Sequence, residues 1–288
     1  MSQSLFHGRL ATKRAVDVRA YPPRRPSTAR AQQLELESKL AELQKNYVEL
    51  HAAIFEAAQV HRRLCAPRLL RFQDFEIASE IFAVRHLPGD FFTVKQAHDV
   101  VVMALGDICG KGLAAGMWTT HLVGLVSRYA AVTSHPESIV AGVNRDLCRL
   151  GSAAALASLF LARLDTATGR FDYCSAGHPP AMLLRRNGEL ESLSKGGLLL
   201  GVDQQAAYVK GSLILNSGDT LLTYSDGITE SRNAAGQEFD YARLEAELRR
   251  AQGASADATL FSVLGAVQDF AAVEPVSDDM TLMIVKRD

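Results

Sequence analysis

Short strand-like runs joined by tight-turn sequences fill most of the chain after residue 74, and they restrict the fold more than any other feature. The clearest pairs of runs are 181–186 with 189–193, which flank Asn187-Gly188, and 159–164 with 170–175, which flank the loop 165–169. Asn-Gly suits the two-residue turns that join antiparallel strands, whereas parallel strands need much longer connections. The pattern therefore predicts antiparallel sheets.

Further runs of this kind and four helical segments complete the pattern. Residues 75–83 alternate between apolar and more polar side chains, as a half-covered strand does. Other strand-like runs cover 91–95, 100–105, 220–224 and 280–286, and segments of helical composition cover 112–131, 136–150, 241–251 and 256–272. Many antiparallel strands with helices gathered in two places predict an α+β fold, with the sheets inside and the helices outside.

The composition is that of an ordinary folded protein. Of the 288 residues, 48% are apolar and 22% are charged, which suffices for one large domain or two small ones. No apolar run is long enough to cross a bilayer, and no apolar core of a signal peptide follows the basic N-terminus. The four cysteines form no Cys-X-X-Cys pair, which argues against a zinc cluster or a disulfide framework and fits a reducing cytoplasm.

Residues 1–33 differ in character from the rest of the chain. They carry seven Lys or Arg residues and one acid, so this segment has a net charge of +6 and the remainder −7. The prolines at positions 22, 23 and 26 oppose a helix there. We expect a disordered basic leader. Contact with nucleic acid or an anionic membrane is the alternative, but the acidic remainder makes no strong case for either partner.

A heptad pattern follows over residues 34–66. Its positions are Leu36, Leu40, Leu43, Tyr47, Leu50, Ile54, Ala57, His61 and Leu64, and all but His61 are apolar or aromatic. Such a seam over four heptads favours a coiled coil that joins two copies of the chain into a homodimer. A long helix packed on its own domain is the alternative. Pro67 ends the helix, so residues 67–288 are predicted to form the main domain.

Aspartates stand at the ends of four predicted strands. Asp90 precedes the run 91–95, Asp107 follows 100–105, Asp226 follows 220–224, and Asp278 and Asp279 precede 280–286. A single aspartate in such a place is usually a turn former. If the strands share a sheet, however, their ends can bring four carboxylates into one pocket.

Such a carboxylate pocket needs a cation, because the charges would otherwise repel one another and lose hydration. Oxygen ligands without a matching set of His or Cys residues suit Mg²⁺ or Mn²⁺ rather than Zn²⁺. Several carboxylates that bridge ions suggest two metals, which together activate water and stabilise a phosphoryl transition state. The residues thus indicate a two-metal site for phosphoryl chemistry.

Five segments, in the same order along the chain, resemble those of one protein family. They are Pro88-Gly89-Asp90-Phe91-Phe92; Gly106-Asp107-Ile108-Cys109-Gly110-Lys111-Gly112; Ser175-Ala176-Gly177-His178-Pro179-Pro180; Gly218-Asp219 with Tyr224-Ser225-Asp226-Gly227-Ile228-Thr229-Glu230; and Asp278-Asp279-Met280-Thr281-Leu282. From about residue 70 to its end, the chain resembles the bacterial SpoIIE-type branch of the PPM (type 2C) metal-dependent serine/threonine phosphatases.

This resemblance implies a fold and a ligand set. The fold is a pair of packed antiparallel sheets with helices on both outer faces, an α-β-β-α sandwich, and the site takes two Mn²⁺ or Mg²⁺ ions. The matching ligands are Asp90 and Asp107 as bridging carboxylates, the backbone carbonyl of Ile108, and Asp226 and Asp278 on the far sheet, so the four aspartates act in catalysis through the metals. Asp279 is the alternative to Asp278 for the last role.

Three further residues of these segments have competing interpretations. His178 invites a role as general acid, but Pro179-Pro180 favours a structural turn. Lys111 can hold a substrate phosphate or be merely solvated. Cys109 stands where serine is usual; it is either an oxidisable thiol beside a ligand or, as we expect, a small buried residue.

The resemblance also implies a function, that of a cytoplasmic protein serine/threonine phosphatase. Its expected substrate is a phosphorylated regulatory protein, an anti-sigma-factor antagonist in a partner-switching pathway. Because only about 33 residues precede the helix, we expect no sensor domain. Control is then expected to come from a protein partner that binds the helix or from oligomerisation, unless there is no activating input at all. A catalytically silent dimeric scaffold with the same fold is the alternative, and the presence of all four aspartates argues against it.

Overall fold

The computed structural model describes residues 28–288, apart from 65–66, 85–86, 152–154 and 275. The chain divides into two compact units, Met1–Leu50 and His51–Asp288. Most of the expected leader lies outside the described residues. Within the described part, no helix is both long enough and apolar enough to cross a membrane.

Helix α1 spans Thr28–Leu64. The predicted start at residue 34 was wrong, because residues 28–33, assigned to the leader, already belong to the helix; alanine and glutamine there favour helix. In the first unit the apolar side chains of the predicted seam are exposed. They are Leu36, Leu40, Leu43, Tyr47 and Leu50.

The last turns of α1, which belong to the second unit, are packed on their own domain. Ala58 and His61 are buried and Ile54 is half-buried, a spacing of i, i+4 and i+7 that defines one helix face. Ala57 and Leu64, which the heptad pattern places on the seam, are exposed. The predicted seam therefore does not run unbroken to Leu64, because the helix turns a different face to the domain.

The first sheet has the strand order β1-β2-β12-β11-β7-β8, with every neighbouring pair antiparallel. Its strands are β1 (Leu69–Phe72), β2 (Phe75–Phe82), β7 (Ala181–Leu184), β8 (Leu190–Leu193), β11 (Thr220–Tyr224) and β12 (Met280–Arg287). The Asn187-Gly188 turn joins β7 to β8, as predicted, and Gly188 has the positive φ of 87° that such turns require.

The second sheet has the order β10-β6-β5-β4-β3, with the short β9 parallel to β6. Its strands are β3 (Phe91–Ala97), β4 (Val100–Ile108), β5 (Ala157–Asp165), β6 (Arg170–Ala176), β9 (Gly196–Gly197) and β10 (Gly211–Ile214). The loop 165–169 joins β5 to β6, as predicted. All the main pairings of this sheet are antiparallel.

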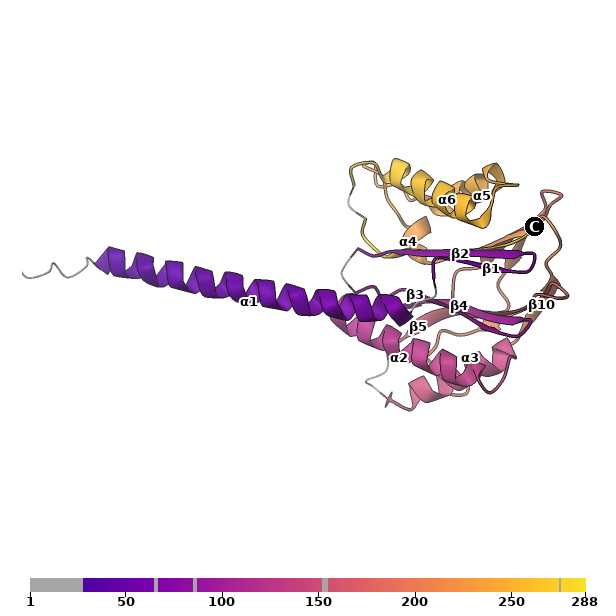
Figure 1. Cartoon of the computed structure of the whole chain (residues 1–288), viewed down its shortest axis with the longest axis horizontal. Helices are drawn as coiled ribbons and strands as arrows, with labels where there is room; N and C mark the ends of the chain where they lie inside the picture. The colour runs from indigo at the N-terminus through magenta and orange to yellow at the C-terminus, as the bar shows by residue number, and fades with distance from the viewer. Residues whose placement is uncertain (1–27, 65–66, 85–86, 152–154, 275) are drawn as a thin grey trace, which may run out of the picture. The chain divides into compact units, whose positions relative to one another are not determined.

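Helices cover the outer face of each sheet (Figure 1). α2 (Leu113–Ala130) and α3 (Pro136–Cys148) pack on the second sheet, whereas α5 (Asp240–Arg250) and α6 (Ala256–Ala271) pack on the first. A short α4 (Asp226–Thr229) follows β11. The predicted α-β-β-α sandwich is confirmed.

Strand β4 shows why the sequence folds into layers. Val101, Met103 and Leu105 point into the core between the two sheets, while Val102 and Ala104 point into the core beneath α2 and α3. A strand covered on both faces is apolar throughout, which explains the continuous apolar run in the sequence. Burial on both faces holds the β4 end, and with it Asp107, in a fixed place.

Candidate metal centre

The four predicted aspartates lie at the ends of paired strands. Asp90 immediately precedes β3, and its neighbour Phe91 pairs with Gly106 of β4. Asp107 lies inside β4, opposite Ser158, rather than after the strand as predicted, because the β4–β5 pairing continues to Ile108. In the other sheet, Tyr224 at the end of β11 pairs with Leu282 of β12. Because paired antiparallel strands end together, the two acids of each sheet lie near each other at the ends of their strands.

Asp90 is the most buried member of the group, with 2% of its surface exposed. Burial raises the pKa of its carboxyl well above the usual range, and the charge of Asp107 raises it further. The Thr281 hydroxyl donates a hydrogen bond of 2.5 Å to Asp90 Oδ2, and the Ser225 hydroxyl also lowers the pKa. These hydroxyls compensate only part of the cost of burying the charge.

Asp107 connects the two halves of the site. Burial raises its pKa to about 7, and the charge of Asp226, followed by that of Asp278, acts in the same direction. A hydrogen bond with Asp90 acts in the opposite direction and lowers the pKa of Asp107, so the two carboxyls are in direct contact. Acids of both sheets therefore act on one another at close range.

Asp226 and Asp278 approach each other from neighbouring strands of the first sheet. Burial raises the pKa of Asp226, and the nearby charge of Asp278 raises it as well. Gly227 permits this approach, because a Cβ there would lie 2.0 Å from the Asp279 carbonyl oxygen. The absence of a side chain at position 227 is thus a condition for the carboxylate cluster.

Lys111 supplies a positive charge in contact with Asp278. Its ammonium donates to Asp278 Oδ2 at 2.5 Å and to the Ser277 carbonyl at 2.9 Å. The cavity at this point, lined also by Gly112 and Asp279, measures only about 10 Å³. Lys111 is therefore neither free nor simply solvated, and in this state its ammonium takes the position of a cation beside Asp278.

Backbone oxygens complete the donor set around Gly89. A Cβ at this position would lie 3.2–3.3 Å from the Gly110 carbonyl, Asp107 Oδ1 and the Ile108 carbonyl. Three oxygens thus converge on a space that a Cβ at position 89 would crowd. The predicted main-chain donor, Ile108, faces the same space as a predicted carboxylate ligand.

These residues fit a divalent cation in chemistry, although they do not form a finished coordination shell. Among the described residues, no group of three or more His, Cys, Asp or Glu side chains has metal-binding geometry. Two of the carboxylates have other partners, Asp90 the hydroxyl of Thr281 and Asp278 the ammonium of Lys111. The oxygen donors and the mutual repulsion of the acids nevertheless match what Mg²⁺ or Mn²⁺ prefers.

Asp279, the alternative to Asp278, has a different environment. Its Oδ1 accepts a hydrogen bond of 2.8 Å from the Val84 amide, and its Oδ2 accepts one of 2.9 Å from the Gly89 amide. Both oxygens therefore bind the loop that leads to Asp90. The sequence did not predict this contact or the roles of Ser225 and Thr281, although the segments Ser225-Asp226-Gly227 and Asp278-Asp279-Met280-Thr281 contain all three residues.

His178 is a structural residue and not an available acid. It is 5% exposed, its Nδ1 lies 2.8 Å from the Ser158 hydroxyl, and burial lowers its pKa to about 3. An imidazole that stays neutral at physiological pH has no proton to donate as imidazolium. This result agrees with the structural turn that Pro179-Pro180 predicts.

Cys109 is exposed, so the expected buried position was wrong: the chain leaves β4 at Ile108, one residue earlier. Its pKa is raised by partial burial and by the charges of Asp107 and Asp226. Because the thiolate is the reactive form, these neighbours oppose oxidation.

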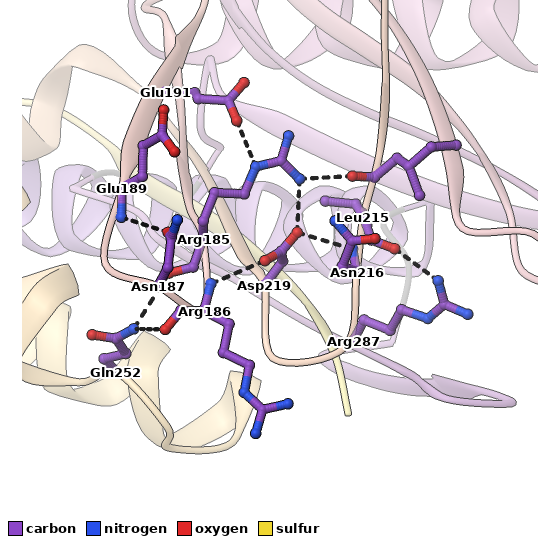
Figure 2. Close-up of polar contacts among 11 residues, drawn as sticks. Arg185, Arg186, Asn187, Glu189, Glu191, Leu215, Asn216, Asp219, Gln252 and Arg287 are labelled. Atoms are coloured by element: carbon purple, nitrogen blue, oxygen red, sulfur yellow. Dashed lines mark hydrogen bonds and ion pairs between the residues drawn. The ribbon is translucent and has the colours of Figure 1, made fainter.

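Asp219, from the quoted Gly218-Asp219 segment, is not part of the site. It precedes β11, whereas Asp226 follows that strand, so the two lie at opposite ends. Figure 2 shows Asp219 among polar partners, with hydrogen bonds from the Arg185 guanidinium at 2.7 Å and from the Arg186 amide at 3.0 Å. The Gly218-Asp219 segment therefore has a structural role at the opposite end of β11 from the candidate metal centre.

Solved structures share this architecture. The SiaA-PP2C domain of Pseudomonas aeruginosa superposes with a TM-score of 0.74 at 16% identity and covers 84% of this chain and 99% of that domain. The PP2C phosphatase domain of SpoIIE from Bacillus subtilis, with a regulatory fragment, gives a TM-score of 0.64 at 16% identity, over 76% of this chain and 64% of that one. RsbX, solved with magnesium, gives a TM-score of 0.58 at 19% identity, over 76% of this chain and 98% of that one. The fold is that of a PP2C-type protein phosphatase domain.

The family follows from the sequence comparison. The family model of Stage II sporulation protein E (SpoIIE) matches residues 97–288, and the chain belongs to this family. The phosphoserine phosphatase RsbU of Bacillus subtilis is 24% identical over 242 residues, which cover 83% of this chain and 71% of RsbU. RsbP of the same organism is 26% identical over 161 residues, or 54% of this chain and 40% of RsbP.

The predicted family and the predicted class, protein serine/threonine phosphatase, are thus confirmed. The family match begins at Ala97, so it does not include Asp90. The place of Asp90 in the candidate centre rests on its contacts in the structure.

Proposed function

We propose that this protein is a metal-dependent phosphatase that hydrolyses phosphoserine or phosphothreonine on a regulatory protein in the cytoplasm. The observation that carries the proposal is the carboxylate cluster of Asp90, Asp107, Asp226 and Asp278, in which the pKa values of the first three are raised by burial and by neighbouring acids. A cluster of this kind is costly for a folded protein unless a cation neutralises it. A silent scaffold would have no reason to retain it.

Each ligand has a proposed place. Asp90 and Asp107 would bridge two Mn²⁺ or Mg²⁺ ions, with the Ile108 carbonyl beside them and with Asp226 and Asp278 from the other sheet. When bound, such ions supply a water nucleophile at neutral pH and neutralise charge on the phosphoryl group. The hydroxyls of Thr281 and Ser225 orient the Asp90 carboxylate toward this space.

The proposed substrate is a phosphorylated anti-sigma-factor antagonist of a partner-switching pathway. Two relatives, RsbU and RsbP, are named as phosphoserine phosphatases. A further solved relative from Mycobacterium tuberculosis, Rv1364c, contains RsbU and RsbW domains in one protein and superposes with a TM-score of 0.64 at 22% identity. These relatives support the pathway class and leave the particular substrate to experiment.

The test is release of phosphate from a panel of phosphorylated antagonist proteins, with Mn²⁺, with Mg²⁺ and with chelator. We expect release that depends on the added metal. No release from any member of the panel at saturating Mn²⁺, from protein that binds Mn²⁺, would favour the silent scaffold instead.

The proposal includes a homodimer through α1, with an activating protein partner as its regulator. The exposed apolar residues of the first unit support it, since Leu36, Leu40, Leu43 and Leu50 of the predicted seam are each more than half exposed. We expect L43D with L50D to give a monomer by light scattering, because two unpaired buried charges exceed what a short coiled coil supplies. A41D with V48D, on the opposite helix face, is the matched control and should remain dimeric.

A further inference from the structure

Asp279 makes an uncommon pair of contacts across the sandwich. From the start of β12 its two carboxylate oxygens reach the backbone of the segment between β2 and β3, where Oδ1 accepts from Val84 and Oδ2 accepts from Gly89. The Val84 side chain is 40% exposed, and no other hydrogen bond to its amide is found among the described residues. One side chain therefore holds the amides of two residues that lie five positions apart in the sequence.

Gly89 is the better secured of the two. Its amide donates to Asp279, and its carbonyl accepts hydrogen bonds from the Thr119 hydroxyl at 2.9 Å and from the Ile108 amide at 3.3 Å. The two peptide groups that flank the Gly89 Cα are thus tied to Asp279, which precedes β12, and to α2 and β4. This glycine also faces the three converging oxygens described above.

The negative charge of Asp279 does not stabilise the cluster of aspartates. It raises the pKa of Asp90 and of Asp107, so as a charge it adds to the repulsion within the cluster. Its hydrogen bonds, in contrast, fix the backbone from which Asp90 projects. Asp278 differs from Asp279, because its Oδ2 accepts a hydrogen bond from the Lys111 ammonium and so already contacts a positive charge.

We infer that Asp279 is a positioning residue for the candidate metal centre, a clamp on the Val84 and Gly89 amides that sets the position of Asp90, and not itself a metal ligand. The clamp is a property of the metal-free chain. Its consequence for metal binding rests on the proposed function. A lost clamp leaves every ligand in the chain but allows Asp90 to move.

The first experiment measures amide hydrogen exchange by NMR on the full chain in chelator, at Val84 and Gly89. Both amides should be protected in the wild-type protein. D279N keeps one acceptor oxygen and places an NH₂ donor against the other amide, so at least one of the two amides should exchange faster by about tenfold or more, because a hydrogen bond to a charged acceptor contributes at least that factor. D278N is the matched control and should leave both rates unchanged. Leu161 in the centre of β5 reports global unfolding and should not respond to either variant.

A second variant separates the clamp from the charge. D279E keeps the negative charge but displaces the carboxylate by one methylene, and it should expose both amides. It also serves if D279N does not fold. Fast exchange of Val84 and Gly89 in the wild-type protein, or unchanged rates in the folded variants, would overturn the clamp.

The second experiment counts bound Mn²⁺ by electron paramagnetic resonance. D279N should bind as many ions as the wild type, with affinity about 10- to 100-fold weaker, the range for residues that orient metal ligands. D278N should bind fewer ions. Loss of an ion in D279N would make Asp279 a ligand and overturn the inference. If the wild type bound no Mn²⁺ at all, the proposed function would fail, while the exchange rates would still decide on the clamp.

Discussion

Asp219 and Asp90 are equally buried, at 2% exposure each, yet their surroundings are opposite. Asp219 accepts hydrogen bonds from the Arg185 guanidinium and from the amides of Arg186 and Asn216, so every contact brings it positive or donor character (Figure 2). Asp90 faces Asp107 instead, with hydroxyls as its donors. Identical burial therefore does not mean an identical role.

The partner of Asp219 shows how the structural site is balanced. Burial lowers the pKa of Arg185, but hydrogen bonds to Glu191 and Asp219 outweigh this effect and raise the pKa overall. The buried charge is thus matched within the chain. In the candidate metal centre the only Lys or Arg side chain paired with an acid of the cluster, among the described residues, is Lys111. A buried carboxylate with its own arginine indicates stability, and a group of carboxylates short of cations indicates a binding site.

The largest expected effect follows from removing a carboxylate of the cluster. D107N should lower phosphatase activity by more than about 100-fold, beyond the loss typical of residues that merely orient a ligand. In chelator the same variant should be more stable to urea than the wild type by about 1 kcal/mol or more, since one repelling charge has gone. Full Mn²⁺-dependent turnover in D107N would contradict the assignment of this site.

The matching substitution at the structural site should act in the reverse sense. D219A removes the buried carboxylate that pairs with the half-buried Arg185 guanidinium, which keeps Glu191 as a partner, and it leaves two backbone amides without an acceptor. We therefore expect the free energy of unfolding to fall by about 3 kcal/mol. Mn²⁺ affinity, measured by calorimetry well below the melting temperature, should stay within about twofold of the wild type, because sites at opposite ends of a strand act independently. A stabilised D219A would erase the distinction between the two carboxylates.

The pH dependence of the stability difference between D107N and the wild type sharpens the comparison further. The pKa of Asp107 is raised to about 7 in the folded protein, so the folded state binds more protons than the unfolded state above its ordinary pKa of 3.8. Asp107 therefore contributes stability at low pH that is lost as the pH rises toward 7. The advantage of D107N in chelator should grow from about pH 4 to pH 7 and then stay constant.

The difference between the two proteins is the quantity to measure, because buried histidine acts in the opposite direction. The pKa of His178 is lowered to about 3, so its contribution is lost as the pH falls. This contribution is the same in both proteins and cancels. Urea unfolding at half-unit pH steps in chelator gives the curve, and a flat difference between pH 4 and pH 7 would show that Asp107 is ordinarily ionised.

Most of the fold, and which aspartates lie near one another, could be predicted from the sequence. Antiparallel hairpins and strand-end glycines place Asp90 beside Asp107 and Asp226 beside Asp278, and these local signals suffice because paired strands end together. β10 (Gly211–Ile214) and β9 (Gly196–Gly197) went unpredicted. They are short and poor in side-chain pattern, and they exist through pairing with β6.

Contacts across long sequence distances could not be predicted. The Gly89 amide and Asp279 are 190 residues apart, and a backbone donor leaves no mark in the sequence. The heptad pattern could not show which face of α1 the domain covers, because Ile54 and His61 satisfy the seam and the domain face alike. A glycine precedes Asp219, as it precedes aspartates of the candidate metal centre, so the local sequence does not distinguish them. The Arg185 guanidinium beside Asp219 does.

The smallest expected effect concerns Lys111, whose ammonium pairs with Asp278 of the cluster. Its ammonium and a bound metal ion would compete for Asp278 Oδ2, so K111M should tighten Mn²⁺ binding by about threefold, as expected for one charge in a solvated position. Both partners are nearly half exposed, at 46% and 42%, so loss of the pair should cost less than about 1 kcal/mol of stability in chelator. Calorimetric titration with Mn²⁺ measures the first effect and urea unfolding the second, with K45M on α1 as a control of equal charge change. Weaker Mn²⁺ binding in K111M would mean that Lys111 orients Asp278 for the metal rather than competing with it.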